Sequence, residues 1–539
     1  MLRLKSVRAL WGWRFAFGIA ASCLLILLSR ANSGASLQTT KPQAASELTV
    51  QQVLANVRKA IGYDRLKGLK RGFVLEEYSG QMIDAPAYRY FGTGGEYREG
   101  TKSADDSRPL GYDGKFGWQL DRAGLPAPMP QRLREKLLIP AWVRGGWWLN
   151  DRAPFVFSLL PEETNDKQVT LSMRLKNGLV GSKIILDRAT WLPSTLVVEY
   201  ERGPYTMAFK DYKETEMGLR VPWQTSVNYR GKDTVSSVKT VSEIAKEEMT
   251  PFAVPPLPAD TTFDNSLPAE LKVAQGVPFS NDSPGHFYVR PLVNGKDVGW
   301  FHFDTGADSM QIDTKLADEL NLPILGKSQT RGADGKPQEV TIRQGKTFQL
   351  GRVTFKNPIF LATDMSGRNA PPGEKRAGYL GYPLFARVVL EVTGGGKTIA
   401  LYDPKSYKLN KGKWQELSYI DVTPAVVCRF EGNREGLFQL DTGTVGTVTF
   451  YEKYIKDEKL LEGRKVKEET NVGAGGTYQE LTGNIEWFEL AGYRFKNPEA
   501  SFRVAGLSRE GGAGVIGREF LSVFKIVFDY PDRRIAFIR

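Results

Sequence analysis

An internal repeat in the C-terminal part of the chain constrains its fold more than any single motif. FHFDTGAD at 301–308 recurs as FQLDTGTV at 438–445, 137 residues later. Four more landmarks recur in the same order at offsets between 136 and 141: RGADG (331–335) as VGAGG (472–476), FKNP (355–358) as FKNP (495–498), GYLGYPLF (378–385) as GVIGREFL (514–521), and TIALYD (398–403) as RIAFIR (534–539). Turn propensity does not produce five ordered landmarks. Residues 266–410 and 411–539 are therefore predicted to be two copies of one lobe.

Each copy has an aspartate, Asp304 or Asp441, at the end of an alternating apolar strand. A carboxylate rarely occupies such a position unless it is paired or used. Two homologous lobes tend to dock about a pseudo-twofold axis, and this would bring Asp304 opposite Asp441. Two carboxyl groups at close range share one proton, so one can activate a water while the other donates to a carbonyl oxygen. The pattern therefore predicts direct attack of water on a peptide bond.

The residues next to the two aspartates suit this chemistry. Thr305 and Thr442 can hydrogen-bond across the axis, while Gly306 and Gly443 let backbone N–H groups approach the carboxylates. Glycine-rich segments between later strands are expected to form hairpin flaps that close over a substrate. The flap candidates are Gly332, Ala333, Gly335, Gly473, Ala474 and Gly476.

On these motifs, residues from about 285 to 539 resemble an aspartic protease of the retropepsin-like kind found in bacteria. The two lobes are fused in one chain, as in pepsin, but each is short, as in retroviral proteases. The resemblance implies a mainly β, bilobal fold with Asp304 and Asp441 as the catalytic dyad and no metal or cofactor. It also implies that Leu380–Gly381 and Ile516–Gly517 support the catalytic loops. Thr444 stands where Ala or Ser is commoner, and which aspartate is the base is left open.

The preceding part of the chain, residues 47–248, has a different pattern. Residues 47–62 have the apolar spacing of a helix, and residues 70–245 contain alternating strands punctuated by turns. Residues 132–151 are expected to form a helix followed by an aromatic loop. A proline-rich segment, 249–265, suits an extended linker to the repeat.

This N-terminal part resembles the LolA-like periplasmic lipoprotein carriers. The likeness is carried by YDGKFGWQLD (112–121), LDRATWLPSTLVVEY (186–200) and FKDYKETEMGLRVPWQTSV (209–227). It implies a curved antiparallel sheet or half-barrel with helices, and a lipid or lipoprotein as partner. Two interpretations of Trp142, Trp147 and Trp148 stay open: they line a lipid-facing concavity, or they are plain core.

The N-terminus predicts export. Basic residues precede FAFGIAASCLLILL (15–28), an apolar run of 14 residues. A bilayer needs about 20. Cleavage after Ala35 would make residues 1–35 a signal peptide, followed by a low-complexity segment at 36–46, and the protein periplasmic or secreted. The alternative is an uncleaved anchor, and only then would the protein contact a membrane.

Other classes of function lack their sequence features. The net charge is +12, but no basic run of five or more occurs, so nucleic acid is not expected as a partner. His286 and His302 are the only histidines, and His302 is interpreted as structural. The sequence thus predicts an exported aspartic endopeptidase acting on polypeptides. The alternative is a non-catalytic protein that binds peptides or lipoproteins in the same cleft.

Overall fold

The computed structural model describes residues 48–539, except 80–85, 102–108, 121–123, 201–202, 247–251, 277–284, 332–336, 367–369, 372, 394, 396, 474–475 and 505–510. The fold is mainly β, as expected. The predicted signal peptide and low-complexity segment lie outside the described residues. None of the helices in the described part of the chain has the length and apolar character of a membrane span.

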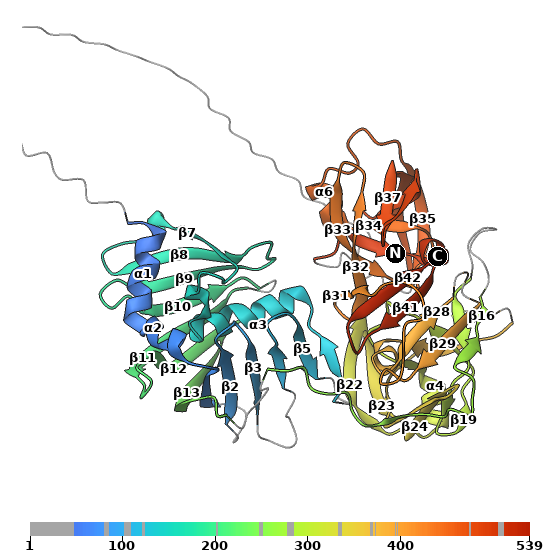
Figure 1. Cartoon of the computed structure of the whole chain (residues 1–539), viewed down its shortest axis with the longest axis horizontal. Helices are drawn as coiled ribbons and strands as arrows, with labels where there is room; N and C mark the ends of the chain where they lie inside the picture. The colour runs from blue at the N-terminus through green and yellow to red at the C-terminus, as the bar shows by residue number, and fades with distance from the viewer. Residues whose placement is uncertain are drawn as a thin grey trace, which may run out of the picture. The chain divides into compact units, whose positions relative to one another are not determined.

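The N-terminal part, up to residue 246, forms one antiparallel sheet whose described strands follow one another in chain order, except that the first, β1, pairs with the last, β13. Figure 1 shows this sheet curled into a half-barrel. The strands are β1 Gly72–Ser79, β2 Ala87–Gly92, β3 Tyr97–Thr101, β4 Leu110–Tyr112, β5 Gly117–Leu120, β6 Pro126–Pro128, β7 Phe155–Leu159, β8 Gln168–Leu175, β9 Gly181–Asp187, β10 Pro193–Val198, β11 Tyr205–Glu214, β12 Arg220–Tyr229 and β13 Lys232–Glu243.

The expected helices are present in this part. They are α1 Val50–Ile61, α2 Tyr63–Gly68, α3 Gln131–Arg144 and the 3-10 turns Trp147–Leu149 and Pro161–Glu163. Thr49 begins α1 with a capping box, in which its hydroxyl accepts from the backbone N–H of Gln52 and the Gln52 side chain accepts in return.

The helix α3 packs across the curled sheet. Its Trp142 contacts Tyr112 of β4 and Phe155 of β7, strands near opposite ends of the sheet. Its Arg144 and Arg89 of β2 both bind the buried carboxylate of Glu77, so that this charge is paired as burial requires. Trp142 is 5% exposed and Trp148 is 1% exposed, which favours the core interpretation of these two tryptophans, whereas Trp147 is half-buried. The likeness to lipoprotein carriers stays a prediction.

The first half of the C-terminal region, residues 266–410, forms two sheets, one of which also includes a strand from the preceding segment. One consists of β16 Ala274–Gln275, β17 Phe287–Val289, β20 Trp300–Phe303, β27 Arg376–Leu380, β21 Gln311–Asp313, β26 Ile359–Thr363, β23 Pro337–Gln344 and β22 Ile324–Arg331, in that order. The other consists of β14 Thr261–Phe263, β25 Val353–Lys356, β24 Thr347–Leu350, β18 Leu292–Val293 and β19 Lys296–Asp297. The short helices are α4 Thr314–Glu319 and α5 Tyr382–Phe385. The segment expected as a linker therefore ends in a strand, β14, which pairs with β25.

The second half, residues 411–539, pairs its strands in the same way. Its sheet consists of β35 Lys467–Gly473, β36 Gly476–Asn484, β39 Glu499–Phe502, β34 Val448–Phe450, β40 Gly514–Ile516, β33 Arg434–Leu440, β32 Thr423–Phe430, β37 Trp487–Leu490 and β38 Tyr493–Lys496, with β31 Ser418–Ile420 beside β32. Its helices are α6 Glu452–Asp457 and α7 Arg518–Leu521. The parallel pair β33·β40 corresponds to β20·β27, and the hairpin β35–β36 corresponds to β22–β23.

A further sheet joins the two halves. Its described strands are, in order, β15 Glu270–Lys272, β29 Thr398–Tyr402, β28 Val389–Val392, β41 Lys525–Asp529, β42 Arg534–Ile538 and β30 Gln415–Glu416. In Figure 1, β28, β29, β41 and β42 lie between the yellow-green first half and the orange second half. In the β28·β41 ladder, Glu391 pairs with Val527. These two residues occupy equivalent positions in the two copies of the repeat. The two halves therefore meet symmetrically here, as identical subunits do in an isologous dimer.

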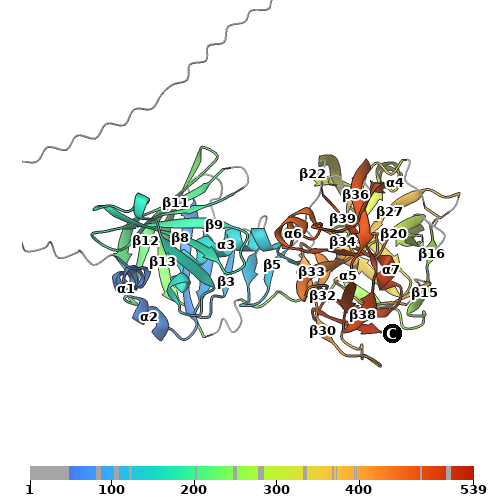
Figure 2. The same cartoon turned by 90° about the horizontal axis from the view of Figure 1, so that it is seen from above.

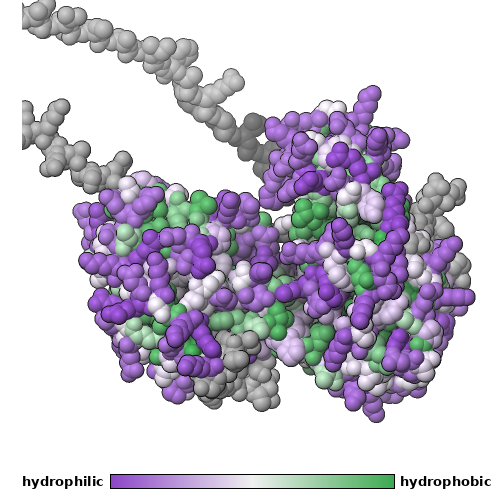
Figure 3. Space-filling model, in the orientation of Figure 1, coloured by the Kyte–Doolittle hydropathy of each residue, from purple (hydrophilic) through white to green (hydrophobic). Residues whose placement is uncertain are grey.

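Buried aromatic and aliphatic side chains form a core that extends through both halves, including Phe303, Leu380, Phe438 and Phe528. On the face seen in Figure 3, hydrophobic residues appear as separate areas among hydrophilic ones. Two of the most exposed apolar residues, Ile324 and Leu325, are neighbours at the start of β22, at 59% and 47%.

Candidate active site

The two D-T-G turns follow equivalent strands. Asp304 comes directly after β20, and Asp441 comes directly after β33. The Asp304 N–H donates to the carbonyl of Leu380 at 3.1 Å, and the Asp441 N–H donates to that of Ile516 at 3.1 Å. The two apolar residues expected to support the catalytic loops thus contact the backbone of the aspartates. This positions both turns at the ends of parallel strand pairs.

The glycines of the two support pairs allow this contact. A Cβ on Gly381 would lie 2.5 Å from the carbonyl oxygen of Ala307, and one on Gly517 would lie 2.5 Å from that of Gly446. Backbone at that distance leaves no room for a side chain. The glycine in each support pair is therefore required by packing against the aspartate-bearing turn.

The threonines of the turns hydrogen-bond across the junction between the halves. The backbone N–H of Thr305 donates to the hydroxyl of Thr442 at 3.0 Å, and the Thr442 N–H donates to the hydroxyl of Thr305 at 2.9 Å. The Thr305 hydroxyl donates on to the Leu440 carbonyl at 2.8 Å, and the Thr442 hydroxyl to the Phe303 carbonyl at 3.2 Å. Both threonines are buried. These bonds hold the two turns in a fixed relation.

The carboxyl groups of Asp304 and Asp441 face each other across the junction between the halves. Gly306 N–H donates to Oδ1 of Asp304 at 2.8 Å, and Gly443 N–H donates to Oδ1 of Asp441 at 2.7 Å. A Cβ on Gly306 would lie 2.6 Å from Cγ of Asp441, and one on Gly443 would lie 2.7 Å from Cγ of Asp304. Each glycine therefore makes room for the carboxyl group of the opposite half. Both aspartates are half-buried.

The electrostatics favour one shared proton. Burial, followed by the negative charge of Asp441 and the hydrogen bond between the two carboxyls, raises the pKa of Asp304 well above its ordinary value. The Gly306 N–H bond and the positive charge of Arg376 lower the pKa of Asp304, but each has a smaller effect than burial or the charge of Asp441. The pair therefore keeps a proton at pH values where an isolated aspartate has lost it.

The surroundings of the two carboxyls differ at one position. The Thr444 hydroxyl donates to Oδ2 of Asp441 at 2.8 Å, whereas the equivalent position in the first half is Ala307, which has no hydroxyl. The Thr444 bond therefore makes the surroundings of the two carboxyls chemically different.

The two flap hairpins are present, with part of each outside the described residues. Gly332, Ala333, Gly335 and Ala474 fall in the segments that the structure does not describe. In the second half, Gly473 pairs with Gly476 at the end of the β35·β36 ladder, so these two glycines lie at the tip of the hairpin.

Two arginines near the dyad were missed by the sequence analysis. Arg376 begins β27, and its charge acts on Asp304. Arg518 is 1% exposed and follows Gly517, so its place directly after the support pair was an available signal. Burial lowers the pKa of Arg518 to about 10, and the nearby charge of Asp441 counteracts this. Arg518 therefore remains charged at neutral pH.

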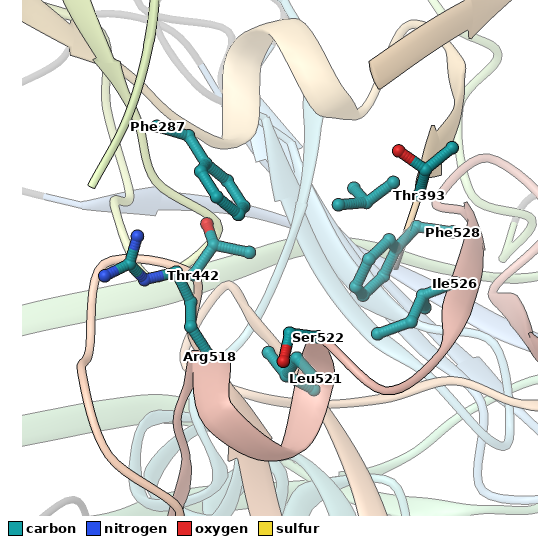
Figure 4. Close-up of a pocket in the computed structure, with 9 residues that line it drawn as sticks. Phe287, Thr393, Thr442, Arg518, Leu521, Ser522, Ile526 and Phe528 are labelled. Atoms are coloured by element: carbon teal, nitrogen blue, oxygen red, sulfur yellow. The ribbon is translucent and has the colours of Figure 1, made fainter. Parts of the chain in front are cut away.

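Arg518 also lines a small apolar hollow beside the Thr442 turn. Its guanidinium lies 5.1 Å from the ring centre of Phe287, which borders the hollow at the same end (Figure 4). The remaining lining residues are Val392, Thr393, Thr442, Leu521, Ser522, Ile526 and Phe528. Most of this lining is apolar and comes from the joining sheet and α7, so the hollow is part of the packing beneath the dyad. In the part of the chain that the structure describes, no group of three or more His, Cys, Asp or Glu residues is arranged to hold a metal ion.

Comparison with known protein families agrees with this geometry. Residues 289–384, which include Asp304 and all of β27, match the family model of aspartyl proteases. The C-terminal region is aspartic protease-like. The match ends before the second half begins, so the pairing of Asp441 with Asp304 rests on the contacts described above. No curated protein matches the chain.

Proposed function

We propose that the aspartic protease-like region is an endopeptidase whose catalytic residues are Asp304 and Asp441. The observation that carries this proposal is that the two carboxyl groups face each other, each against the glycine of the opposite turn, where reciprocal threonine bonds join the D-T-G turns. Paired carboxyls with one proton can supply a base and an acid at once, which hydrolysis of a peptide bond requires.

In the proposed reaction, Asp441 is the carboxylate and Asp304 holds the proton. Asp441 takes a proton from a water between the carboxyls, while the water oxygen attacks the carbonyl carbon of the scissile bond. Asp304 gives its proton to the carbonyl oxygen, forming a neutral tetrahedral diol. Asp304 then takes a proton back from a diol hydroxyl and Asp441 gives one to the nitrogen, so the C–N bond breaks and both carboxyls regain their starting state.

The proposed substrate is a polypeptide bound in extended form between the halves. The hairpins β22–β23 and β35–β36 would add strand-like hydrogen bonds to its backbone. We also propose that the protein is exported, on the basis of the apolar segment at 15–28.

The test is digestion of a peptide library by the full chain across acid to neutral pH. Wild type should cleave, and Asp304→Asn and Asp441→Asn should each lower kcat by about 10²- to 10⁴-fold or more, because each removes one partner of the acid–base pair. A matched control is Asp457→Asn, the same change at an exposed residue of α6. Its activity should equal that of wild type.

Equal activity of wild type and both dyad variants would contradict the endopeptidase proposal. If all three are inert at every pH but still bind library peptides, the result favours a peptide-binding module with the same cleft.

A further inference from the structure

Three polar rings lie side by side on the face of the first sheet that carries Asp304. Tyr288 of β17 pairs with His302 of β20, and His302 pairs with Tyr379 of β27. Figure 2 shows β20 and β27 next to each other. The ring centres of Tyr288 and Tyr379 lie 5.5 and 5.2 Å from that of His302. Since side chains alternate along a strand, His302 shares its face with Asp304, two residues later, while Phe303 points into the core.

A guanidinium covers these rings. Arg376, the first residue of β27, lies 5.5 Å from the ring centre of Tyr288 and 4.9 Å from that of Tyr379. It donates to the Tyr288 hydroxyl at 2.7 Å and also to the Tyr379 hydroxyl. Stacking and two hydrogen bonds fix the orientation of its plane. Its charge reaches the dyad, because it lowers the pKa of Asp304 against the larger effect of burial. We call Tyr288, His302, Tyr379 and Arg376 the cationic row.

The imidazole of His302 adds a hydrogen-bond donor and a hydrogen-bond acceptor to the cationic row. The residue is 3% exposed, and neither ring nitrogen has a hydrogen-bond partner among the described residues. Burial, followed by the neighbouring His286 and then the charges of Arg376 and Arg518, keeps the pKa of His302 well below its ordinary value, so the ring is neutral and has one donor and one acceptor. Buried polar groups are normally bonded, so this face is suited to a polar group of a substrate rather than to an apolar one.

The second half has nothing comparable at the equivalent positions. There Ala425 of β32 pairs with Gln439 of β33, and Gln439 pairs with Val515 of β40. Gln439 is occupied, because its amide N–H donates to the Ile420 carbonyl at 3.3 Å and its oxygen accepts from the Tyr451 hydroxyl. The position equivalent to Arg376 is Gly512. At these four equivalent positions the two halves therefore differ, because the first half has a cation and polar rings and the second half has small or neutral groups.

Resting on the proposed endopeptidase function, we propose that the cationic row selects an acidic side chain, aspartate or glutamate, at one of the two substrate positions that flank the scissile bond. A substrate held across the dyad places the side chain on one side of the bond against the first half, next to Asp304. There a carboxylate meets the half-buried guanidinium of Arg376, a group that binds anions. Lysine or arginine at that position is repelled. The flanking position on the other side faces Gln439 and Val515 and shows no preference for charge.

The experiment compares matched peptides with the full chain at about pH 6, where glutamate is ionised. One pair has Glu or Gln on the N-terminal side of the scissile bond, and the other pair has Glu or Gln on the C-terminal side. In wild type, kcat/KM should favour Glu over Gln by about 10- to 100-fold at one of the positions, as expected for hydrogen bonds to a charged group, and be near equal at the other. The preference should fall below about pH 4, as the glutamate becomes protonated.

Arg376→Gln should bring the Glu-to-Gln ratio near one while the Gln peptide is still cleaved, which shows that the variant is folded. The matched control is Arg290→Gln, which also removes an arginine stacked on an aromatic ring, Trp300, of the first half but lies outside the cationic row. It should keep the wild-type ratio.

Two results would overturn the inference and leave the endopeptidase standing: cleavage by wild type without a preference for Glu at either position, or an unchanged preference in Arg376→Gln. Failure of wild type to cleave any peptide at any pH would overturn the endopeptidase proposal and this inference together. If Arg376→Gln does not fold, the Glu-to-Gln ratio of kcat/KM measured for wild type tests the inference without the variant.

Discussion

At the two D-T-G turns, each glycine is needed for a neighbour across the junction. Gly306 faces the Asp441 carboxyl and Gly443 faces that of Asp304, at distances that no Cβ tolerates. From the sequence, each glycine was expected to act within its own turn, by letting backbone N–H groups approach the carboxylate of that turn. The structure adds that the same glycines determine how closely the two carboxyls approach each other.

Gly306→Ala should therefore lower kcat by about 100-fold, because displacing a catalytic group by an ångström has an effect of that size. Steady-state kinetics on a cleaved peptide would measure it. Gly68→Ala is the matched control, since no atom lies within 4 Å of the added methyl group. Wild-type kcat in Gly306→Ala would show that the carboxyls are not held at the described separation.

The raised pKa of Asp304 has a consequence for stability. A carboxyl whose pKa is higher in the folded than in the unfolded state contributes stability below the unfolded value of about 4 and loses it as pH rises through the folded pKa. Asn cannot ionise. Asp304→Asn should therefore have a higher Tm than wild type at pH 8, and this advantage should vanish near pH 4.

Thermal unfolding of both proteins across pH 4 to 8 would check this prediction. Asp457→Asn, at an exposed site, should show no such pH-dependent difference. A Tm of Asp304→Asn below that of wild type at pH 8 would mean that ionisation of the dyad does not destabilise the fold.

At the scale of elements, alternation and helical spacing predicted local structure well. The helix expected at 47–62 is α1, and the helix expected within 132–151 is α3 followed by a 3-10 turn. The strand β14 was not foreseen in the proline-rich segment, because its partner, β25, lies about 90 residues later in the chain. Pairing at that distance leaves no local pattern.

The joining sheet depends on strands from both halves, and β41 lies at its centre. Phe528 of β41 is 0% exposed and also lines the hollow beneath the dyad. Phe528→Ala should lower the free energy of unfolding by about 3–5 kcal/mol, the usual effect of emptying a buried aromatic site. Urea denaturation would measure it. The exposed neighbour Val523, at 41%, provides the control, and Val523→Ala should change stability by less than about 0.5 kcal/mol. A similar loss in both variants would contradict the central role of β41.

At the scale of the whole molecule, the two halves have the same strand pairing but different chemistry. The halves pair equivalent strands at Glu391 and Val527, so the backbone around the dyad is nearly symmetric. The side chains are not symmetric. Thr444 is the equivalent of Ala307 in the repeat, and Gly512 is the equivalent of Arg376 in the cationic row. In the proposed mechanism, these differences between side chains on a nearly symmetric backbone place the proton on one aspartate and distinguish the two sides of a scissile bond.

The sequence alone was sufficient to predict the mainly β architecture. It also led to the prediction that Asp304 and Asp441 form a pair, because a motif repeated at matched offsets is visible without coordinates. The family match over residues 289–384 supports the protease-like character of that region. The assignments of catalytic roles, export and the ligand of the curled sheet stay predictions.

Only the tertiary structure decided which groups surround the dyad. Arg376 is far from Asp304 in the chain, and the parallel pairing of β20 with β27 brings its charge within range of that carboxyl. His302 was interpreted as structural, and its position on the Asp304 face emerged from the register of three strands. Contacts of this kind depend on strand order and register, which arise from packing of the whole chain and leave no trace in the spacing of nearby residues.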